Sequence, residues 1–250
     1  MNKPIVSLII QMRNNSSRLP YKVTKKIMDK YTMEYLLERV KKTKLVDNII
    51  VATTTSEKDD VICSVCRNLQ IKFYRGSEQN VLDRYFQAAL ISNSDIVVRV
   101  TGDCILIDPL IIDKMIEVFK NNNCDFLDPI YSGIGKGGGA GFPDGFNPEI
   151  FSFKALEKAY ENANTPDELE HVTGYIINNL NCMKYNIILK EVYHNIPFER
   201  LHLSLDTKRD LDIITCILTN LYPDNPNFTI DDVLSFLNQG DTYSNLTQNA

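Results

Sequence analysis

The strongest signal for ligand binding lies in residues 11–22, QMRNNSSRLPYK, directly after the apolar run at residues 5–10. It holds Arg13, Arg18 and Lys22 among small polar residues. Guanidinium and ammonium groups beside exposed backbone amides bind a polyphosphate through bidentate and point-charge contacts. Scattered basic residues more often form a solvated turn. The position of this segment directly after the first predicted strand favours a phosphate site.

Two aspartates could complement these cations, because each follows another predicted strand. Asp103 comes after a strand predicted over residues 95–100, and Asp206 after one predicted over residues 201–205. Proteins commonly hold Mg²⁺ with one or two carboxylates plus phosphate oxygens. If the two strands are neighbours, the carboxylates would share one magnesium ion. The alternative is that each aspartate caps a helix, and Asp206 fits this well because a helix is predicted over residues 208–221.

Two other motifs are interpreted as structural. Cys63 and Cys66 form a C-x-x-C pair inside a helical pattern, with no second pair at zinc-finger spacing. Residues 135–141, GKGGGAG, lack the G-K-[ST] ending of a phosphate-binding loop and have no following helix, so we expect an irregular loop. The six cysteines are too sparse for a disulfide scaffold.

The elements that must position these residues alternate between strand and helix. Strands are predicted over residues 5–10, 48–52, 71–74, 95–100, 185–192 and 201–205. Helices are predicted over residues 33–40, 59–69, 81–91, 108–119, 152–162, 167–180, 208–221 and 230–237. This alternation predicts an α/β fold, a mostly parallel sheet with helices on both faces. Ligands of such sheets bind beyond the carboxyl ends of the strands.

Composition limits the classes of protein that this chain could be. Its 250 residues are 44% hydrophobic and 24% charged, which predicts one domain over residues 1–238 and a polar tail over 239–250. The net charge of −5 argues against a nucleic-acid partner or an anionic membrane surface. The apolar run at residues 5–10 is too short for a signal peptide or a membrane span. We therefore expect a cytoplasmic protein.

Residues 11–22 also resemble a known signature, A-R-x-x-S-x-R-L-P-x-K. It belongs to the CTP-dependent cytidylyltransferases that activate acidic sugars, the acylneuraminate and KDO type, and the likeness is strongest to the spore-coat polysaccharide branch. The residues in register are Arg13, Ser16, Arg18, Leu19, Pro20 and Lys22. The chain has Met12 where the family has alanine, Asn15 where it has glycine and Tyr21 where glycine is usual, and it keeps the cations.

Further blocks are similar to that branch and come in the same order. They are RGSEQNVLDRY at residues 75–85, RVTGDCILIDP at 99–109, FPDGFNPEIF at 142–151, EHVT at 170–173 and LDTKRDL at 205–211. Ile105 stands where the branch has proline. Together the blocks favour the fold and the use of CTP more strongly than they favour any particular acceptor.

The resemblance implies a Rossmann-like fold of the nucleotide-diphosphosugar transferase type. It implies that an acceptor oxygen attacks the α-phosphorus of CTP, that pyrophosphate leaves, and that Mg²⁺ assists. Arg13, Arg18 and Lys22 would be catalytic. The acceptor would be an acidic sugar or a small phosphorylated molecule, and the product would feed surface polysaccharide or glycan synthesis. Residues 122–200 would cover the acceptor and contribute to a homodimer.

The resemblance also implies the remaining site residues. The nucleotide would contact Met12, Arg13, Asn14, Ser17, Arg18, Lys22, Arg75, Thr101 and Asp103. The acceptor would contact Asp144, Glu170 and His171, and the metal Asp103 and Asp206. Arg75, Asp83 and Arg84 fall near the base and ribose, and Arg75 is the preferred candidate because it ends a predicted strand. An ion-paired helix face is the alternative for Asp83.

Three other functions stay open at this point. A glycosyltransferase of similar fold usually has D-x-D at a strand end, but the D-x-D here, Asp210-Leu-Asp212, falls within a predicted helix. A sugar-1-phosphate nucleotidyltransferase normally has a glycine-rich loop, which residues 11–22 lack. A non-catalytic nucleotide-binding paralogue is the third, and Tyr21 and Ile105 are mild indications of it.

Overall fold

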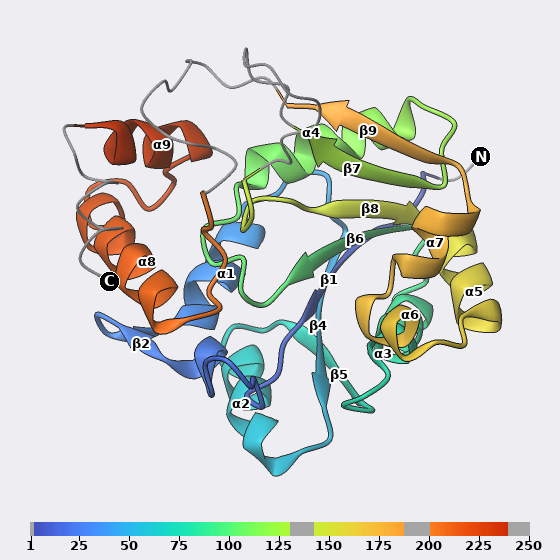
Figure 1. The fold of residues 1–250 in the computed structure, drawn as a ribbon, viewed down its shortest axis with the longest axis horizontal. Coiled ribbons are helices and arrows are strands. Elements are labelled where there is room, and N and C mark those ends of the chain that lie inside the picture. Colours follow the sequence, from blue (N-terminus) through green and yellow to red (C-terminus); the bar gives the residue numbers. More distant parts are fainter. Residues whose placement is uncertain (1–2, 131–142, 188–200, 240–250) are drawn as a thin grey trace.

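The structure is a computed structural model that describes residues 3–130, 143–187 and 201–239 (Figure 1). Within these residues a seven-stranded sheet has the order β5-β4-β1-β6-β8-β7-β9. Its strands are β1 (Val6–Gln11), β4 (Asn48–Thr54), β5 (Lys72–Gly76), β6 (Ile96–Thr101), β7 (Phe126–Ile130), β8 (Glu149–Ser152) and β9 (Cys182–Asn186). The fold is therefore the α/β fold that the sequence predicts.

The direction of the strands changes along the sheet. β1 pairs in parallel with β4 and β6, and β4 pairs in parallel with β5. β8 runs antiparallel to both β6 and β7, and β7 and β9 are parallel to each other. Strands β1, β4, β5 and β6 consequently deliver their carboxyl ends to one edge of the sheet, where ligands of such folds bind.

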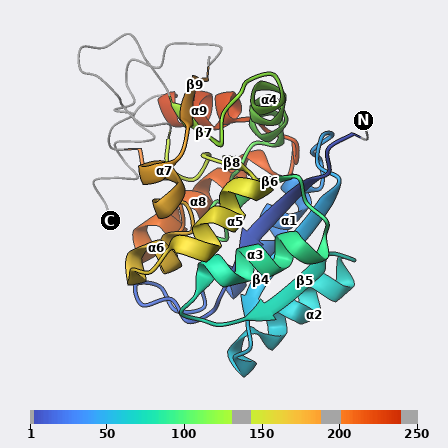
Figure 2. The ribbon, with the colours of Figure 1, turned by 90° about the vertical axis from the view of Figure 1, so that its right-hand side faces the viewer.

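Helices cover both faces of the sheet (Figure 2). They are α1 (Thr32–Val40), α2 (Asp60–Asn68), α3 (Val81–Ile91), α4 (Pro109–Lys120), α5 (Phe153–Asn162), α6 (Pro166–His171), α7 (Gly174–Asn179), α8 (Lys208–Leu221) and α9 (Ile230–Asn238). Apolar residues of α1, α2, α4, α8 and α9 form one core with the sheet, and those of α3, α5 and α7 form a second core on the other face.

The helices begin where their sequences supply caps. The Asn80 side chain accepts from the backbone N–H of Asp83 at the start of α3. Asp108 caps α4 from just before Pro109, whose missing N–H costs nothing in a first turn. At α8, Thr207 and Asp210 form a reciprocal capping box.

The structure corrects several predictions for the chain after residue 120. No strand is predicted between residues 100 and 185, but β7 (Phe126–Ile130) and β8 (Glu149–Ser152) form there. The helix predicted over 167–180 is broken into α6 and α7, because Val172 lies between them at φ 57°. Residues 201–205 join no sheet strand and form only an isolated bridge to Asp144.

Smaller differences have local causes. The short hairpin β2 (Lys26–Ile27) and β3 (Lys30–Tyr31) was not predicted, because two-residue strands are too short to show a period. The strand predicted over 185–192 begins earlier, at Cys182, and its residues after 187 lie outside the described part. The glycine-rich segment 135–141 and the tail from residue 240 onward also lie outside it.

Candidate active site

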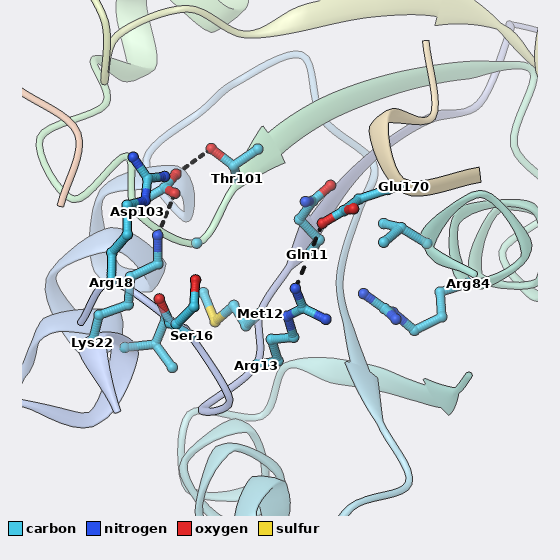
Figure 3. Close-up of a pocket in the computed structure, with 14 residues that line it drawn as sticks. Gln11, Met12, Arg13, Ser16, Arg18, Lys22, Arg84, Thr101, Asp103 and Glu170 are labelled. Carbon is cyan, nitrogen blue, oxygen red and sulfur yellow. Dashed lines mark hydrogen bonds and ion pairs between the residues drawn. The ribbon is translucent and has the colours of Figure 1, made fainter. Parts of the chain in front are cut away.

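A cavity of about 230 Å³ opens at the carboxyl ends of β1 and β6, between the segment after β1 and helices α3 and α6 (Figure 3). Gly102 brings the two strand ends close together, and its N–H donates to the Gln11 carbonyl at 2.9 Å. A Cβ at this position would lie 2.8 Å from that carbonyl oxygen, so only glycine fits. The lining residues are Gln11, Met12, Arg13, Ser16, Ser17, Arg18, Lys22, Val23, Val81, Arg84, Thr101, Gly102, Asp103 and Glu170.

Asn14 anchors the segment after β1 and does not itself line the cavity. Its backbone N–H donates to Asp59 Oδ1 at 2.8 Å, and its side-chain amide donates to the Lys58 carbonyl at 2.7 Å. Its side-chain oxygen accepts from the Thr24 hydroxyl at 2.8 Å. Asn14 thereby fixes the backbone that carries Arg13, in place of the nucleotide contact that the resemblance implies for it.

Tyr21 explains how the segment turns without the usual glycine. It adopts a left-handed conformation, φ 60° and ψ 26°, just before the 3₁₀ turn η1 (Lys22–Thr24). Its ring is half exposed, so its bulk does not fill the cavity. The turn directs Lys22 inward.

Lys22 joins the two aspartates that the sequence singles out, and Figure 3 shows its contact with Asp103. Its Nζ lies 2.6 Å from Asp103 Oδ2 and 3.0 Å from Asp206 Oδ1. The chain segments that carry the two aspartates also meet, because the Leu205 N–H donates to the Asp103 carbonyl at 3.0 Å. The two carboxylates converge as expected. The strand that was expected to lie next to β6 and to carry Asp206 there is, however, not formed.

Neither aspartate serves as a helix cap. The cap of α8 is Thr207, and the cap of α4 is Asp108. The alternative interpretation of Asp103 and Asp206 is therefore wrong, and both carboxylates are directed at Lys22.

Lys22 and Asp103 hold each other in their charged forms. Burial by itself would lower the pKa of Lys22, but the nearby Asp103 and Asp206 carboxylates hold that pKa above its usual value. Burial by itself would raise the pKa of Asp103, but the Lys22 ammonium and the Thr101 hydroxyl bonded to it hold that pKa below its usual value. The floor of the cavity thus carries Asp103 paired with Lys22, and Lys22 also contacts Asp206, which is outside the cavity lining.

This donor set fits a magnesium ion that also binds phosphate. Asp103 and Asp206 offer hard oxygen ligands, as Mg²⁺ requires. Among the described residues no group of three or more His, Cys, Asp or Glu side chains could hold a metal ion. The remaining ligands would therefore be water and phosphate oxygens, which is the usual arrangement for Mg²⁺ in nucleotide sites.

The other cations of the segment lie on either side of this floor. Arg18 Nη2 lies 2.8 Å from Asp206 Oδ1, and 64% of its side chain is exposed, so it can turn toward a ligand. Arg13 lies at the opposite end, with Nη1 3.5 Å from Glu78 Oε1 and Nη2 3.7 Å from Glu170 Oε1 (Figure 3). The cavity between them is lined mainly by polar and cationic groups.

Arg84 lines the cavity, whereas Arg75 does not. Arg75 donates to the Thr54 and Ser56 carbonyls and to Asp60, none of which lines the cavity. Arg84 is buried, which lowers its pKa, and its Nε has no hydrogen-bond partner in the described structure. Arg84 can be recognised as a lining residue from the sequence, because Val81 and Arg84 are three residues apart on α3 and lie on the same face of that helix.

The residues expected at the acceptor end are only partly brought together. Glu170 lines the cavity. His171 lies on the exposed side of α6, with Nε2 3.4 Å from Asp167 Oδ1. Asp144 is 2.8 Å from His202 Nδ1 and lies outside the cavity lining. His202 received no role in the sequence analysis.

The cysteine pair lies inside a helix, as predicted. Cys63 and Cys66 lie on α2 and are buried, and burial raises the pKa of Cys66 to about 12. A thiol with so high a pKa is a poor metal ligand or nucleophile at neutral pH. Separately, none of the helices in the described part is both long and apolar enough to span a bilayer.

Comparisons with known proteins agree with this geometry. A family model described as cytidylyltransferase matches residues 7–222. An uncharacterized protein of Methanocaldococcus jannaschii, MJ1063, is 36% identical over 241 residues, which cover 96% of this chain and 93% of the relative. Spore coat polysaccharide biosynthesis protein SpsF of Bacillus subtilis is 27% identical over 94% of each chain. A solved cytidylyltransferase from Leptospira borgpetersenii has a TM-score of 0.84 and 28% identity, covering 99% of this chain and 98% of its own.

Proposed function

This chain belongs to the cytidylyltransferase family, and we propose that it transfers CMP from CTP to an acidic sugar or a small phosphorylated acceptor, with release of pyrophosphate. The observation that carries the proposal is the contact of Lys22 with both Asp103 and Asp206 at the floor of a cavity lined by further arginines. Fixed carboxylates beside cations at the carboxyl ends of parallel strands are what a metal-bound triphosphate requires.

In the proposed reaction an acceptor oxygen attacks the α-phosphorus of CTP, and the bond to the β-phosphate breaks as pyrophosphate leaves. Arg13, Arg18 and Lys22 neutralise the charge that develops on the departing phosphates. Because the backbone around Asn14 is fixed by three hydrogen bonds, Arg13 is held near the cavity before the ligand arrives.

Asp103 and Asp206 would hold Mg²⁺, which supplies Lewis-acid stabilisation of phosphate oxygens when bound. In the free protein Lys22 neutralises these carboxylates. A triphosphate gives the Lys22 ammonium a second anionic partner and so frees carboxylate oxygens for the ion. Nucleotide and metal are therefore expected to bind together more tightly than either binds alone.

The proposed acceptor end is the part of the cavity that Glu170 lines. The name of the Bacillus subtilis relative places that protein in spore coat polysaccharide biosynthesis, which supports a product used in surface polysaccharide or glycan synthesis here. We also propose a homodimer that works in the cytoplasm, on the family resemblance alone.

The rival functions have less support. Asp210 is bonded to Thr207 at the start of α8, and Asp212 pairs with Lys208, so this D-x-D is used within the helix. A non-catalytic nucleotide binder would explain Tyr21, but the left-handed turn at Tyr21 leaves Lys22 directed at both aspartates.

The test is pyrophosphate release with Mg²⁺ and each of the four nucleoside triphosphates, against acidic sugars and small phosphorylated acceptors. Release with CTP and one acceptor is the expected result. Lys22→Met should abolish most of it, whereas the matched control Lys26→Met, on an exposed lysine outside the cavity lining, should not. A rise in melting temperature with CTP but no release would favour a non-catalytic binder, and no rise with any triphosphate would overturn the proposal.

A further inference from the structure

Arg84 is a buried cation at the cavity, and the described residues provide no carboxylate to pair with it. Only 2% of the residue is exposed, yet it lines the cavity, and Figure 3 shows its guanidinium directed toward Arg13. Within the described part of the chain its hydrogen-bond acceptors are two backbone carbonyls, and no carboxylate lies within ion-pairing distance of it. A buried charge is costly unless an opposite charge pairs with it.

The fold fixes the position of this guanidinium. Arg84 lies near the start of α3, which is capped by Asn80. Gly76 at the end of β5 leaves room for its side chain, because a Cβ there would lie 3.0 Å from Arg84 Cγ. Nη1 donates to the Ser77 carbonyl and, at 3.0 Å, to the Glu78 carbonyl, whereas Nε has no partner among the described residues. The charge is therefore held in place before any ligand binds.

A second guanidinium, that of Arg13, lies beside Arg84. The Glu78 carbonyl accepts from Nη1 of both arginines, at 3.0 Å from Arg84 and 3.4 Å from Arg13. The carboxylates of Glu78 and Glu170 are partly exposed and lie 3.5 and 3.7 Å from the Arg13 guanidinium. Burial and the neighbouring Arg13 charge both lower the pKa of Arg84. An anion bound against both guanidinium groups would relieve this repulsion.

We propose that Arg84, together with Arg13, binds an oxyanion of a substrate, either a phosphate of the nucleotide or the acid group of the acceptor. The inference rests on the proposed function, because it concerns the same cavity. Phosphates and carboxylates accept paired, charge-assisted hydrogen bonds from guanidinium groups, and these are the strong ones. The family resemblance instead places Arg84 near the base and ribose, but both are uncharged and would leave the buried charge of Arg84 unmatched.

The test measures oxyanion binding in Arg84→Gln, which removes the charge and keeps a hydrogen-bond donor. Isothermal titration calorimetry with CMP and with cytidine gives an affinity ratio that reports one phosphate. Inorganic phosphate is then added to protein saturated with CMP, and the rise in melting temperature reports an oxyanion site that the nucleotide leaves open. The matched control is Arg67→Gln, because Arg67 is exposed on α2 and lies over the Phe73 ring, outside the cavity lining.

If the oxyanion is a phosphate of the nucleotide, we expect Arg84→Gln to lower the ratio of CMP to cytidine affinity by about 10- to 100-fold. If it belongs to the acceptor, that ratio stays unchanged and the response of the CMP-saturated protein to inorganic phosphate is lost. Arg67→Gln should match the wild type in both measurements. A merely structural role at the Ser77 and Glu78 carbonyls would weaken CMP and cytidine equally and keep the phosphate response. That result, or no change at all, would overturn the inference.

Further results keep the inference separate from the proposed function. If Arg84→Gln does not fold, Arg13→Gln removes the other guanidinium, and wild-type values of both measurements in that variant would overturn the inference. If the wild type releases pyrophosphate from CTP but neither measurement changes in Arg84→Gln, the inference alone fails. If Arg84→Gln loses oxyanion binding but the wild type transfers CMP to no acceptor, the proposed function alone fails. A wild type that binds neither CMP nor inorganic phosphate would overturn both.

Discussion

The first 120 residues build their share of the site from parallel strands, whereas the chain from β7 onward builds its share from turns and short helices. Arg13, Arg18 and Lys22 follow β1, and Asp103 follows β6, the parallel neighbour of β1. Topology alone therefore places these four side chains at one edge of the sheet. The later region supplies Glu170 from a helix of six residues and Asp206 from a segment outside the sheet.

The two regions consequently depend on different contacts. In the first region the cations are placed by strand register and by the hydrogen bonds of Asn14. In the later region Asp206 is placed by tertiary contacts, including the Leu205 N–H on the Asp103 carbonyl. This difference suggests that the first region fixes the triphosphate end of the site and that the later region fixes the acceptor and completes the metal ligands.

The largest loss of activity is expected from a substitution at Asp103, where the two regions meet. Asp103→Asn removes one carboxylate from the proposed metal site and leaves the buried Lys22 with one charged partner, so kcat should fall by about 10²- to 10³-fold. Pyrophosphate release with saturating CTP measures it, and Asp212→Asn on the exposed face of α8 is the matched control. Wild-type turnover by Asp103→Asn would mean that the regions do not share a metal site.

A smaller loss of activity is expected from a substitution at Arg18, which belongs to the first region alone. Arg18→Gln removes one charge-assisted contact to phosphate, worth about 1.5–3 kcal/mol, so kcat/KM for CTP should fall roughly 10- to 100-fold. Steady-state kinetics at varied CTP and at varied acceptor separate the effects. An increase confined to the KM for the acceptor would contradict the assignment of this region to the triphosphate.

Stability should respond to pH with opposite signs in the two regions. In the later region burial, together with the nearby Glu149, raises the pKa of Asp128 to about 6. The native state then binds more protons than the unfolded chain between about pH 4 and 6, so stability falls as pH rises through that range. Asp128→Asn should remove this fall and stabilise the protein at pH 7 by up to about 3 kcal/mol.

The variant to compare with Asp128→Asn lies in the first region, at Asp47. The Lys3 ammonium and the Val6 N–H hold the pKa of Asp47 below its usual value, so its contribution is present above about pH 4 and is lost as pH falls further. Asp47→Asn should therefore destabilise the protein at pH 7, where Asp128→Asn stabilises it. Urea unfolding between pH 4 and 8 measures both, and the same sign for both variants would contradict the comparison.

The smallest effect is expected at the acceptor end. Glu170 is 58% exposed and its ion pair with Arg13 spans 3.7 Å, so the pair is worth about 1 kcal/mol or less. Glu170→Gln should change the KM for the acceptor by up to about 5-fold and leave the KM for CTP nearly unchanged. Glu157→Gln, on α5 and outside the cavity lining, is the control. A change in the KM for CTP alone would move Glu170 to the nucleotide end.

Apart from the short hairpin β2–β3, the sequence by itself determined the strands of the main sheet and the α-helices up to residue 120 to within a residue or two, because buried parallel strands and amphipathic helices have distinct periods. It also determined the segment with the three cations, since position after the first strand of a parallel sheet fixes where such a segment lies. Asp103 was identified for the same reason.

Only the tertiary structure decided the rest, because the deciding contacts join residues far apart in the chain. Asp206 reaches Lys22 through a segment that pairs with no sheet strand, so no local period predicts it. Arg84 rather than Arg75 lines the cavity because of how α3 packs on the sheet. His202 reaches Asp144 and Asp206 together only once the turn at Gly145 has packed against Leu203, a contact between segments almost 60 residues apart.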